Sequence, residues 1–433
     1  MDKKDKFIIE GLEGEKKLKG SVKIQGAKNA ALKAMAAAAL FDGAVELTNV
    51  PETEDIKTMS EILSKLGARV EKSETLTIDA SKINNTDIDA ELAGSMRASV
   101  VLTGPLLARF GRVSFPAPGG CVIGARPIDL FLDGYRSMRA TVAENGLYDI
   151  QAEKGLKGAE MFFDKQTVGG TETLMMAAVL AKGRTVLKNC AMEPEIASIA
   201  EWLNSCGANI KGAGTTTIEI EGTAGKLLKS IKPYVTIPDR IESGSFLILG
   251  ALCAEELKIE GCEPKHMEAA INVLHNAGVS IEIDKSNLLV RSVTEKGVSF
   301  KAVNDLRTHE YPGFPTDLQA PMTVFLTQAA GKSSVLETIY DGRFKYVEDL
   351  KQAGADIAVV NPREIVIKGP TALSELPSGQ ELRVHDIRAG FAIVLAALVG
   401  KGKFTVNNVR LLDRGYERLE EKLKAIGANI ERK

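Results

Sequence analysis

The stretch SCGANIKG (residues 205–212) decides the fold, because related stretches recur along the chain about every seventy residues. In each copy a glycine follows a helical pattern and precedes a short strand of alternating residues, which is typical of a glycine at a helix C-terminus. A further copy, SMRATVAE (137–144), carries Arg139 at the glycine position. The remaining copies are KLGARVEK (65–72), NAGVSIEI (276–283), QAGADIAV (352–359) and AIGANIER (425–432).

These copies predict an α/β protein built from repeats. Upstream of each glycine, an alanine-rich helical stretch leads to a strand and then to a polar loop that opens the next helix, so each unit is predicted to run β-α-β-α-β-β. One unit cannot bury both helical faces alone, so we expect two groups of three units around shared cores. The stretch YVTIPDRIESG (234–244) marks the crossing between the groups, and KGSVKIQG (19–26) is expected to close the C-terminal group. The repeats alone are equally compatible with a scaffold that has no enzyme activity.

The composition excludes several classes of protein. A formal net charge of −2 predicts no general attraction to nucleic acid or to an anionic membrane, so an anion site must be built from a few converging cations. No apolar run is long enough to span a bilayer, and no secretory signal is visible. The five cysteines form no CxxC pair, which favours a reducing, cytoplasmic compartment, and the four scattered histidines predict no zinc site.

One cysteine lies outside any core pattern. Cys121 belongs to PGGCVIGARPIDL (118–130), where glycines and prolines predict a bend and not a strand. A structural cysteine prefers the core, whereas a reactive one needs partial exposure and a nearby positive charge, which Arg126 could supply. This loop alone leaves both interpretations open.

Other loops carry charge at predicted helix starts. Lys28 and Asn29 follow a strand and precede a helix, where a cation and the helix amides could hold a phosphate. Arg97 begins an apolar helix, an unfavourable place for a cation unless an anion binds there. Asp317 is predicted to cap a helix N-terminus and could also accept a proton. A solvated lysine, a surface arginine and a plain helix cap are the alternatives.

An aspartate close to an arginine recurs at three predicted helix starts, in IPDRIESGSF (237–246), VHDIRAGFA (384–392) and LLDRGYERLEEK (411–422). One such pair is an ordinary surface ion pair of little energetic value. Several cations at equivalent loops of a threefold-repeated domain are instead expected to converge on one face.

Seven motifs give the chain a specific resemblance: GAKNA, MRAS, PGGCVIGARPIDL, PDRIE, PGFPTDLQA, DIRAG and DRGYERL. From about residue 7 to its C-terminus the chain resembles the enolpyruvyl transferases, in particular those that act on UDP-N-acetylglucosamine. The resemblance implies two inside-out α/β barrel domains, each of three β-α-β-α-β-β units. These would be residues 28–238 and residues 1–27 with 239–433, with the active site in the cleft between them. It also implies transfer of enolpyruvate from phosphoenolpyruvate to the 3′-hydroxyl of UDP-N-acetylglucosamine, the first committed step of peptidoglycan synthesis, without metal or organic cofactor.

The resemblance also assigns roles to individual residues. It implies that Asp317 takes the proton of the attacking hydroxyl and that Lys28 belongs to the catalytic group. Cys121 would be the general acid at the methylene carbon or would hold phosphoenolpyruvate covalently, and an epoxide phosphonate such as fosfomycin is expected to alkylate it. The residues implied to bind the substrates are Asn29, Arg97, Arg126, Asp129, Leu130, Lys165, Thr167, Val168, Ile339, Arg343, Arg388 and Arg414.

Some positions depart from the family pattern. His385 stands where threonine usually precedes DIRA, Gly170 replaces an alanine, and Arg139 replaces the repeat glycine. DGRFKYV (341–347) stands where ENRFMHV is more usual. These changes lie beside the implied catalytic residues, so they bear on binding more than on the type of reaction.

Two alternatives stay open. The first is the sister enzyme that acts on shikimate 3-phosphate, which Cys121 and GARPIDL disfavour. The second is a non-catalytic paralogue that binds nucleotide sugars, which the presence of Cys121, Asp317 and Lys28 disfavours.

Overall fold

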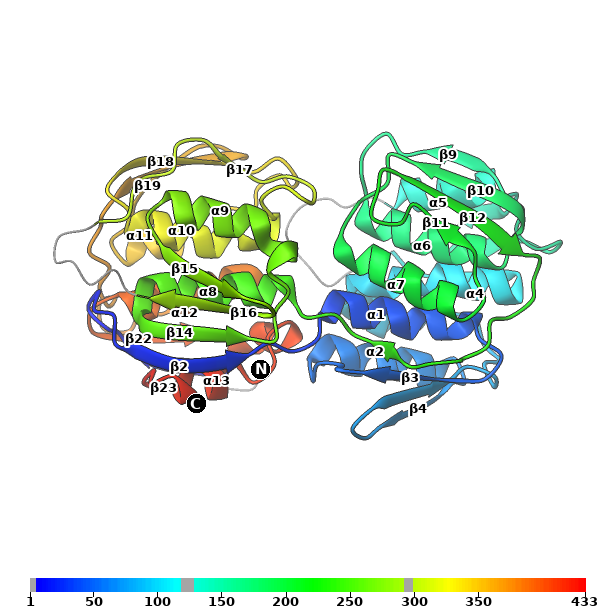
Figure 1. Ribbon diagram of the computed structural model, residues 1–433, viewed down its shortest axis with the longest axis horizontal. Coiled ribbons are helices and arrows are strands. Elements are labelled where there is room, and N and C mark those ends of the chain that lie inside the picture. Colours follow the sequence, from blue (N-terminus) through cyan, green and yellow to red (C-terminus); the bar gives the residue numbers. More distant parts are fainter. Residues whose placement is uncertain (1–4, 118–127, 292–298) are drawn as a thin grey trace. The chain divides into compact units, whose positions relative to one another are not determined.

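A computed structural model describes residues 5–117, 128–291 and 299–433 of the chain (Figure 1). The described residues form two compact units, which we call the middle unit and the terminal unit. The middle unit runs from Gly26 to Ile237, and the terminal unit contains the residues up to Gln25 and those from Pro238 onward. Cys121 and Arg126 lie outside the described residues, so what the sequence implies for them stays a prediction.

The middle unit contains three sheets with the strand orders β13-β3-β5-β4, β6-β8-β7 and β11-β12-β10-β9. Its first repeat has α1 (Lys28–Ala37), β3 (Ala44–Thr48), α2 (Glu54–Lys65), β4 (Arg69–Lys72) and β5 (Leu76–Asp79), with β13 (Tyr234–Val235) as its edge strand. The second has α3 (Ala90–Ser95), α4 (Thr103–Phe110), β6 (Arg112–Phe115), α5 (Asp129–Ser137), β7 (Thr141–Glu144) and β8 (Tyr148–Gln151). The third has β9 (Glu160–Phe162), α6 (Val168–Val179), β10 (Lys182–Lys188), α7 (Pro194–Ser205), β11 (Ile210–Lys211) and β12 (Thr217–Thr223).

The terminal unit also contains three sheets, with the orders β15-β16-β14-β2, β17-β18-β20-β19 and β21-β22-β1-β23. The first repeat has β2 (Leu18–Lys23), α8 (Arg240–Cys253), β14 (Ala254–Glu260), α9 (Glu268–Asn276), β15 (Ser280–Asp284) and β16 (Asn287–Arg291). The second has β17 (Leu306–Arg307), α10 (Gln319–Thr327), β18 (Gly331–Leu336), α11 (Val347–Gln352), β19 (Asp356–Asn361) and β20 (Glu364–Gly369). The third has β21 (Leu382–Arg383), α12 (Ile387–Val399), β22 (Lys403–Asn407), α13 (Leu419–Ala425) and β23 (Ile430–Arg432), joined by β1 (Lys6–Glu10).

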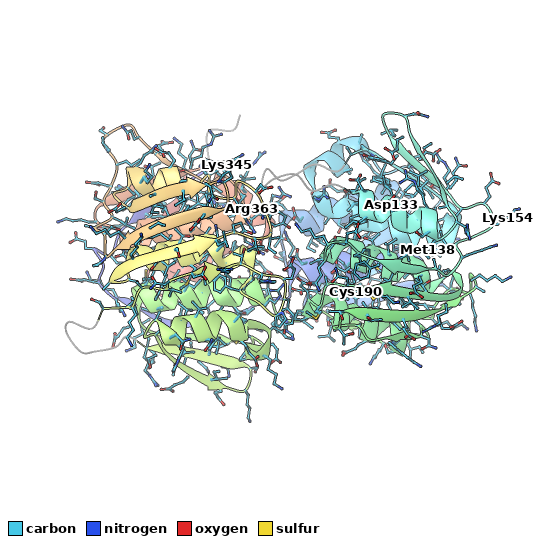
Figure 2. All side chains as sticks on the ribbon, turned by 90° about the horizontal axis from the view of Figure 1, so that it is seen from above. Asp133, Met138, Lys154, Cys190, Lys345 and Arg363 are labelled. Atoms are coloured by element: carbon cyan, nitrogen blue, oxygen red, sulfur yellow. The ribbon has the colours of Figure 1, made fainter. Side chains whose placement is uncertain are left out.

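Apolar helices form the centre of each unit, and the sheets lie outside them. In the terminal unit α8, α10 and α12 pack on one another and are buried on nearly every side (Figure 1). Helices that are apolar all round require such a buried place. Charged side chains such as Lys154 and Lys345 are exposed, whereas Met138 and Cys190 are buried (Figure 2). The predicted α/β fold of β-α-β-α-β-β repeats is confirmed.

The repeat glycines end helices in the left-handed region of backbone space. In the five copies that carry glycine, φ lies between +95° and +108°. Glycine adopts these angles without the steric cost that a side chain brings. Arg139 takes the same place with φ of +72°, which costs a non-glycine residue about 1–2 kcal/mol.

The strand expected to close the C-terminal group does so. Residues 18–23 form β2, which pairs in parallel with β14 of the terminal unit, with Val22 opposite Ile259. Within the described ranges, no helix is both long and apolar enough to cross a membrane.

Candidate functional site

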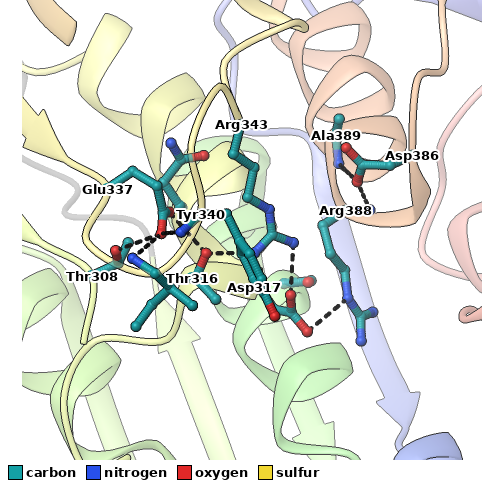
Figure 3. A network of polar contacts seen from close by, with 12 residues as sticks. Thr308, Thr316, Asp317, Glu337, Tyr340, Arg343, Asp386, Arg388 and Ala389 are labelled. Atoms are coloured by element: carbon teal, nitrogen blue, oxygen red, sulfur yellow. Dashed lines mark hydrogen bonds and ion pairs between the residues drawn. The ribbon is translucent and has the colours of Figure 1, made fainter. Parts of the chain in front are cut away.

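Asp317 lies at the centre of a charged cluster in the terminal unit (Figure 3). It occupies a 3-10 turn, Thr316–Leu318, directly before α10. The Nη2 atom of Arg343 donates to Oδ1 of Asp317 at 2.7 Å, and Nε of Arg388 lies 3.5 Å from Oδ2. The prediction that Asp317 caps a helix is wrong, because two guanidinium groups hold its carboxylate and neither the turn nor α10 begins with a side-chain cap.

The two arginines determine the charge of Asp317. Arg343 and Arg388 are each 6% exposed, whereas the Asp317 side chain keeps 29% of its surface. Burial raises the pKa of Asp317, but Arg343 and Arg388 outweigh that effect and hold the pKa well below its ordinary value. In this arrangement Asp317 is ionised at neutral pH and is a weak base, since a general base works best with a pKa near the working pH.

A second carboxylate, the fully buried Glu337, orients Arg343 (Figure 3). The Thr316 hydroxyl accepts a hydrogen bond from Nη1 of Arg343 and donates one to Oε2 of Glu337 at 2.8 Å. The other oxygen of Glu337 accepts from the Thr308 hydroxyl at 3.0 Å and from the backbone N–H of Ile339 at 2.8 Å. Glu337 therefore ties the loop that carries Ile339, one of the predicted substrate residues, to the side chain that holds Arg343. No sequence motif pointed to Glu337.

Arg388 comes from the first turn of α12. Asp386 caps this helix, and its Oδ1 accepts from the backbone N–H groups of Arg388 at 2.8 Å and Ala389 at 3.0 Å. The guanidinium carbon lies 5.2 Å from the ring centre of Tyr416. Its Nη1 atom is buried and has no hydrogen-bond partner among the described residues. A buried cationic donor in this state suits an anionic oxygen of a ligand.

The three Asp-Arg motifs have different outcomes. Asp239 and Asp386 cap α8 and α12, so these two motifs do begin helices. The third prediction is wrong: Asp413 and Arg414 end a 3-10 turn, and α13 begins only at Leu419. Asp413 pairs with Arg432 at 2.7 Å.

Arg240, which follows the Asp239 cap, adds positive charge close to Asp317. Its guanidinium lies 5.6 Å from the ring centre of Tyr311. Both residues line a small hollow together with Lys265 and Leu318. Arg343 and Arg388 contact the Asp317 carboxylate, and Arg240 lowers its pKa from nearby. Two of the three Asp-Arg motifs thus place an arginine near Asp317, and the convergence of all three stays a prediction.

The middle unit holds Lys28 at the first position of α1. Its Nζ atom lies 2.8 Å from Oδ2 of Asp55 in α2, and both side chains are buried. Asn29 follows it and is half-buried. Arg97 begins a 3-10 turn, Arg97–Leu102, so the α-helix predicted to begin there begins only afterwards, as α4. The partner Asp55 was not predicted, because no motif marks it.

The remaining predicted residues of the middle unit lie at the starts of α5 and α6. Thr167 caps α6, accepting a hydrogen bond from the helix's first turn at 3.2 Å, and Val168 is its first residue. Lys165 is exposed in the preceding loop. Asp129 begins α5 and is exposed, whereas Leu130 packs against the core. Helices α5 and α6 pack on each other, and the turn of Arg97 packs on both α1 and α6.

Four of the five cysteines lie in the described part of the chain, and all four are buried free thiols. Burial raises the pKa of Cys190 and Cys262 to about 11 and that of Cys253 to about 12. Thiols with such pKa values carry little thiolate and react slowly. No group of three or more His, Cys, Asp or Glu side chains in the described ranges is placed to hold a metal ion.

Comparisons with known proteins agree on one family. The family described as EPSP synthase (3-phosphoshikimate 1-carboxyvinyltransferase) matches residues 12–423. The chain is 44% identical to a UDP-N-acetylglucosamine 1-carboxyvinyltransferase of Desulforapulum autotrophicum, over 97% of this chain and 98% of that one. It is also 44% identical to the protein of the same name from Trichlorobacter lovleyi, over 99% of both chains.

A solved structure shares the fold. The enolpyruvyl transferase NikO from Streptomyces tendae superposes with a TM-score of 0.87 over 99% of both chains. At 24% sequence identity this likeness concerns the fold alone.

Proposed function

The chain belongs to the EPSP synthase family, and from that premise we propose that it transfers the enolpyruvate group of phosphoenolpyruvate to the 3′-hydroxyl of UDP-N-acetylglucosamine, releasing phosphate. The observation that carries the choice of acceptor is the 44% identity, over nearly the whole of both chains, to relatives named for that reaction. This reaction is the first committed step of peptidoglycan synthesis.

The arginines of the Asp317 cluster support a site for phosphoenolpyruvate. Its phosphate and carboxylate together carry about three negative charges, and planar guanidinium groups bind both kinds of oxygen in pairs. Arg343 and Arg388 are buried, charged and held in place, and Arg388 keeps a buried Nη1 donor without a partner in the described chain. We assign the anionic groups of phosphoenolpyruvate to these two residues.

The same assignment explains how Asp317 becomes a base. While Arg343 and Arg388 hold its carboxylate, its pKa stays low and it cannot take a proton from a hydroxyl efficiently. A bound trianion competes for these guanidinium groups and cancels their charge, so the pKa of Asp317 rises when the substrate is present. Asp317 is thus activated by the substrate itself.

The reaction is an addition followed by an elimination. The 3′-hydroxyl attacks C2 of phosphoenolpyruvate and loses its proton to Asp317, while C3 gains a proton from Cys121. The tetrahedral ketal then loses phosphate from C2 and a proton from C3 to the Cys121 thiolate, which restores the double bond and the thiol. The sugar nucleotide is assigned to Asn29, Asp129, Leu130, Lys165, Thr167, Val168 and Ile339. Lys28, Arg97, Arg126 and Arg414 are assigned to the anionic groups of phosphoenolpyruvate together with Arg343 and Arg388.

We propose that the reaction takes place in the cytoplasm. The four cysteines of the described ranges are free thiols, which is the state that a reducing compartment maintains.

Release of inorganic phosphate from phosphoenolpyruvate tests the function. We expect release with UDP-N-acetylglucosamine and none with shikimate 3-phosphate. Arg388→Gln should raise the KM for phosphoenolpyruvate about tenfold or more, because it removes a charged partner of the substrate. Arg291→Gln, at an exposed position of the same unit, is the matched control and should behave as the wild type. Release with shikimate 3-phosphate alone would assign the sister reaction instead.

A further inference from the structure

His385 contacts a buried carboxylate next to the Asp317 cluster. It lies between β21 and α12, and its Nε2 atom is 2.7 Å from Oδ2 of Asp349 in α11. Asp349 is 7% exposed, and its other oxygen accepts from the backbone N–H of Arg383 at 2.8 Å. One carboxylate therefore holds residues 383–385 at two points.

The two segments joined in this way are the ones that carry the arginines of Asp317. Arg343 precedes α11 by four positions, and Arg388 follows His385 by three. Their guanidinium groups reach the same carboxylate from these two segments. The two segments are thus held together at two places: by the contact between His385 and Asp349, and by Asp317, which contacts both arginines.

The backbone between His385 and Arg388 has little conformational freedom. The next residue, Asp386, accepts from the backbone N–H of Arg388 at 2.8 Å, and Arg388 is already in the first turn of α12. A displacement of His385 therefore moves the start of the helix and the Arg388 backbone with it. Recognition by guanidinium groups needs placement to within about 0.5 Å, so small shifts at this point change binding.

We infer that His385 is a positioning residue for the phosphoenolpyruvate site, which sets the spacing of Arg343 and Arg388 through Asp349. The inference rests on the proposed function, because it takes these arginines as the holders of phosphoenolpyruvate. It gives a role to a position where the sequence departs from the usual threonine.

Two substitutions separate positioning from packing. His385→Leu keeps a side chain of similar bulk but removes the donor to Asp349, whereas His385→Gln keeps an N–H donor of similar reach. We expect His385→Leu to raise the KM for phosphoenolpyruvate about tenfold, with little change in the KM for UDP-N-acetylglucosamine, and His385→Gln to recover most of the loss. His275→Leu, at an exposed position in the last turn of α9, is the matched control.

An unchanged KM for phosphoenolpyruvate in His385→Leu overturns the inference. An equal rise in the KM values for both substrates, together with a lower urea midpoint, also overturns it, because that result marks a purely structural role. If the wild type releases no phosphate with either acceptor, the proposed function fails separately. Calorimetry of phosphoenolpyruvate binding then tests the inference by itself: weaker binding to His385→Leu than to His385→Gln supports it, and equal affinities overturn it.

Discussion

Glu172 gives the middle unit a pH-dependent stability that can be measured by itself. It lies in α6, is 1% exposed, and its Oε2 atom is 3.2 Å from Nζ of Lys33 in α1. Beyond this ion pair, neither carboxylate oxygen has a hydrogen-bond donor in the described chain. Burial raises the pKa of Glu172 from 4.5 to about 7, with Lys33 opposing the rise and the carboxylates of Glu195 and Glu193 adding to it.

The sign of the effect follows from proton binding. Between pH 4.5 and pH 7 the folded chain holds a proton on Glu172 that the unfolded chain has released, so the free energy of unfolding falls as the pH rises through this range. Because one pKa unit is worth about 1.4 kcal/mol, the total loss is about 3 kcal/mol, most of it between pH 5 and pH 8. The glutamine side chain of Glu172→Gln does not titrate, so this variant should lack this part of the pH dependence.

Urea unfolding followed by tryptophan fluorescence measures this directly. The chain has one tryptophan, Trp202, which is buried in α7 of the same unit and therefore reports on that unit. The difference in unfolding free energy between Glu172→Gln and the wild type should shift by about 2–3 kcal/mol in favour of the variant from pH 5 to pH 8. Glu46→Gln, at an exposed position of β3, is the control and should follow the wild type. Parallel profiles of Glu172→Gln and the wild type would refute the reasoning, because Glu172 would then titrate alike in both states.

Three further predictions concern single residues. Asp317→Asn should lower turnover by about a hundredfold or more, since it removes the base but keeps the shape, and near-normal turnover would place the base elsewhere. Its urea midpoint should also fall, because Arg343 and Arg388 lose their charged partner. An epoxide phosphonate such as fosfomycin should label Cys121 alone, because the other four cysteines are buried, and peptide mass spectrometry that finds the label on another cysteine contradicts this. Gly26→Ala should lower the urea midpoint, at a cost of about 1–3 kcal/mol, because its Cβ would lie 1.8 Å from the carbonyl oxygen of Asn49. An unchanged midpoint would show that the backbone there yields easily.

Local patterns carried the prediction of the repeats. The sequence predicts the glycines that end the helices, because helix termination at positive φ depends on neighbouring residues only. All five of these glycines adopt that conformation. The same holds for the apolar helices α8, α10 and α12, whose composition requires burial. The motif VHDIRAGFA likewise begins a helix with an aspartate cap, as expected at its position.

The sequence-based predictions were wrong where a side chain pairs with residues distant in the sequence. Asp317 has the local setting of a helix cap, yet it pairs with Arg343 and Arg388, because two cations outcompete backbone amides for a carboxylate. At LLDRGYERLEEK, Asp413 pairs with Arg432, and the helix begins only at Leu419.

The sequence by itself determined the repeating α/β architecture and the apolar centres, and it supplied the residue types of the proposed phosphoenolpyruvate site, since each depends on composition and on spacing within one unit. Only the tertiary structure decided which charges meet. The contacts of Lys28 with Asp55, of Glu337 with Thr316 and of His385 with Asp349 join segments 21 to 36 residues apart. Such contacts form only when separate helices and loops pack together, and no periodicity in the chain encodes the distance between two side chains that approach through space.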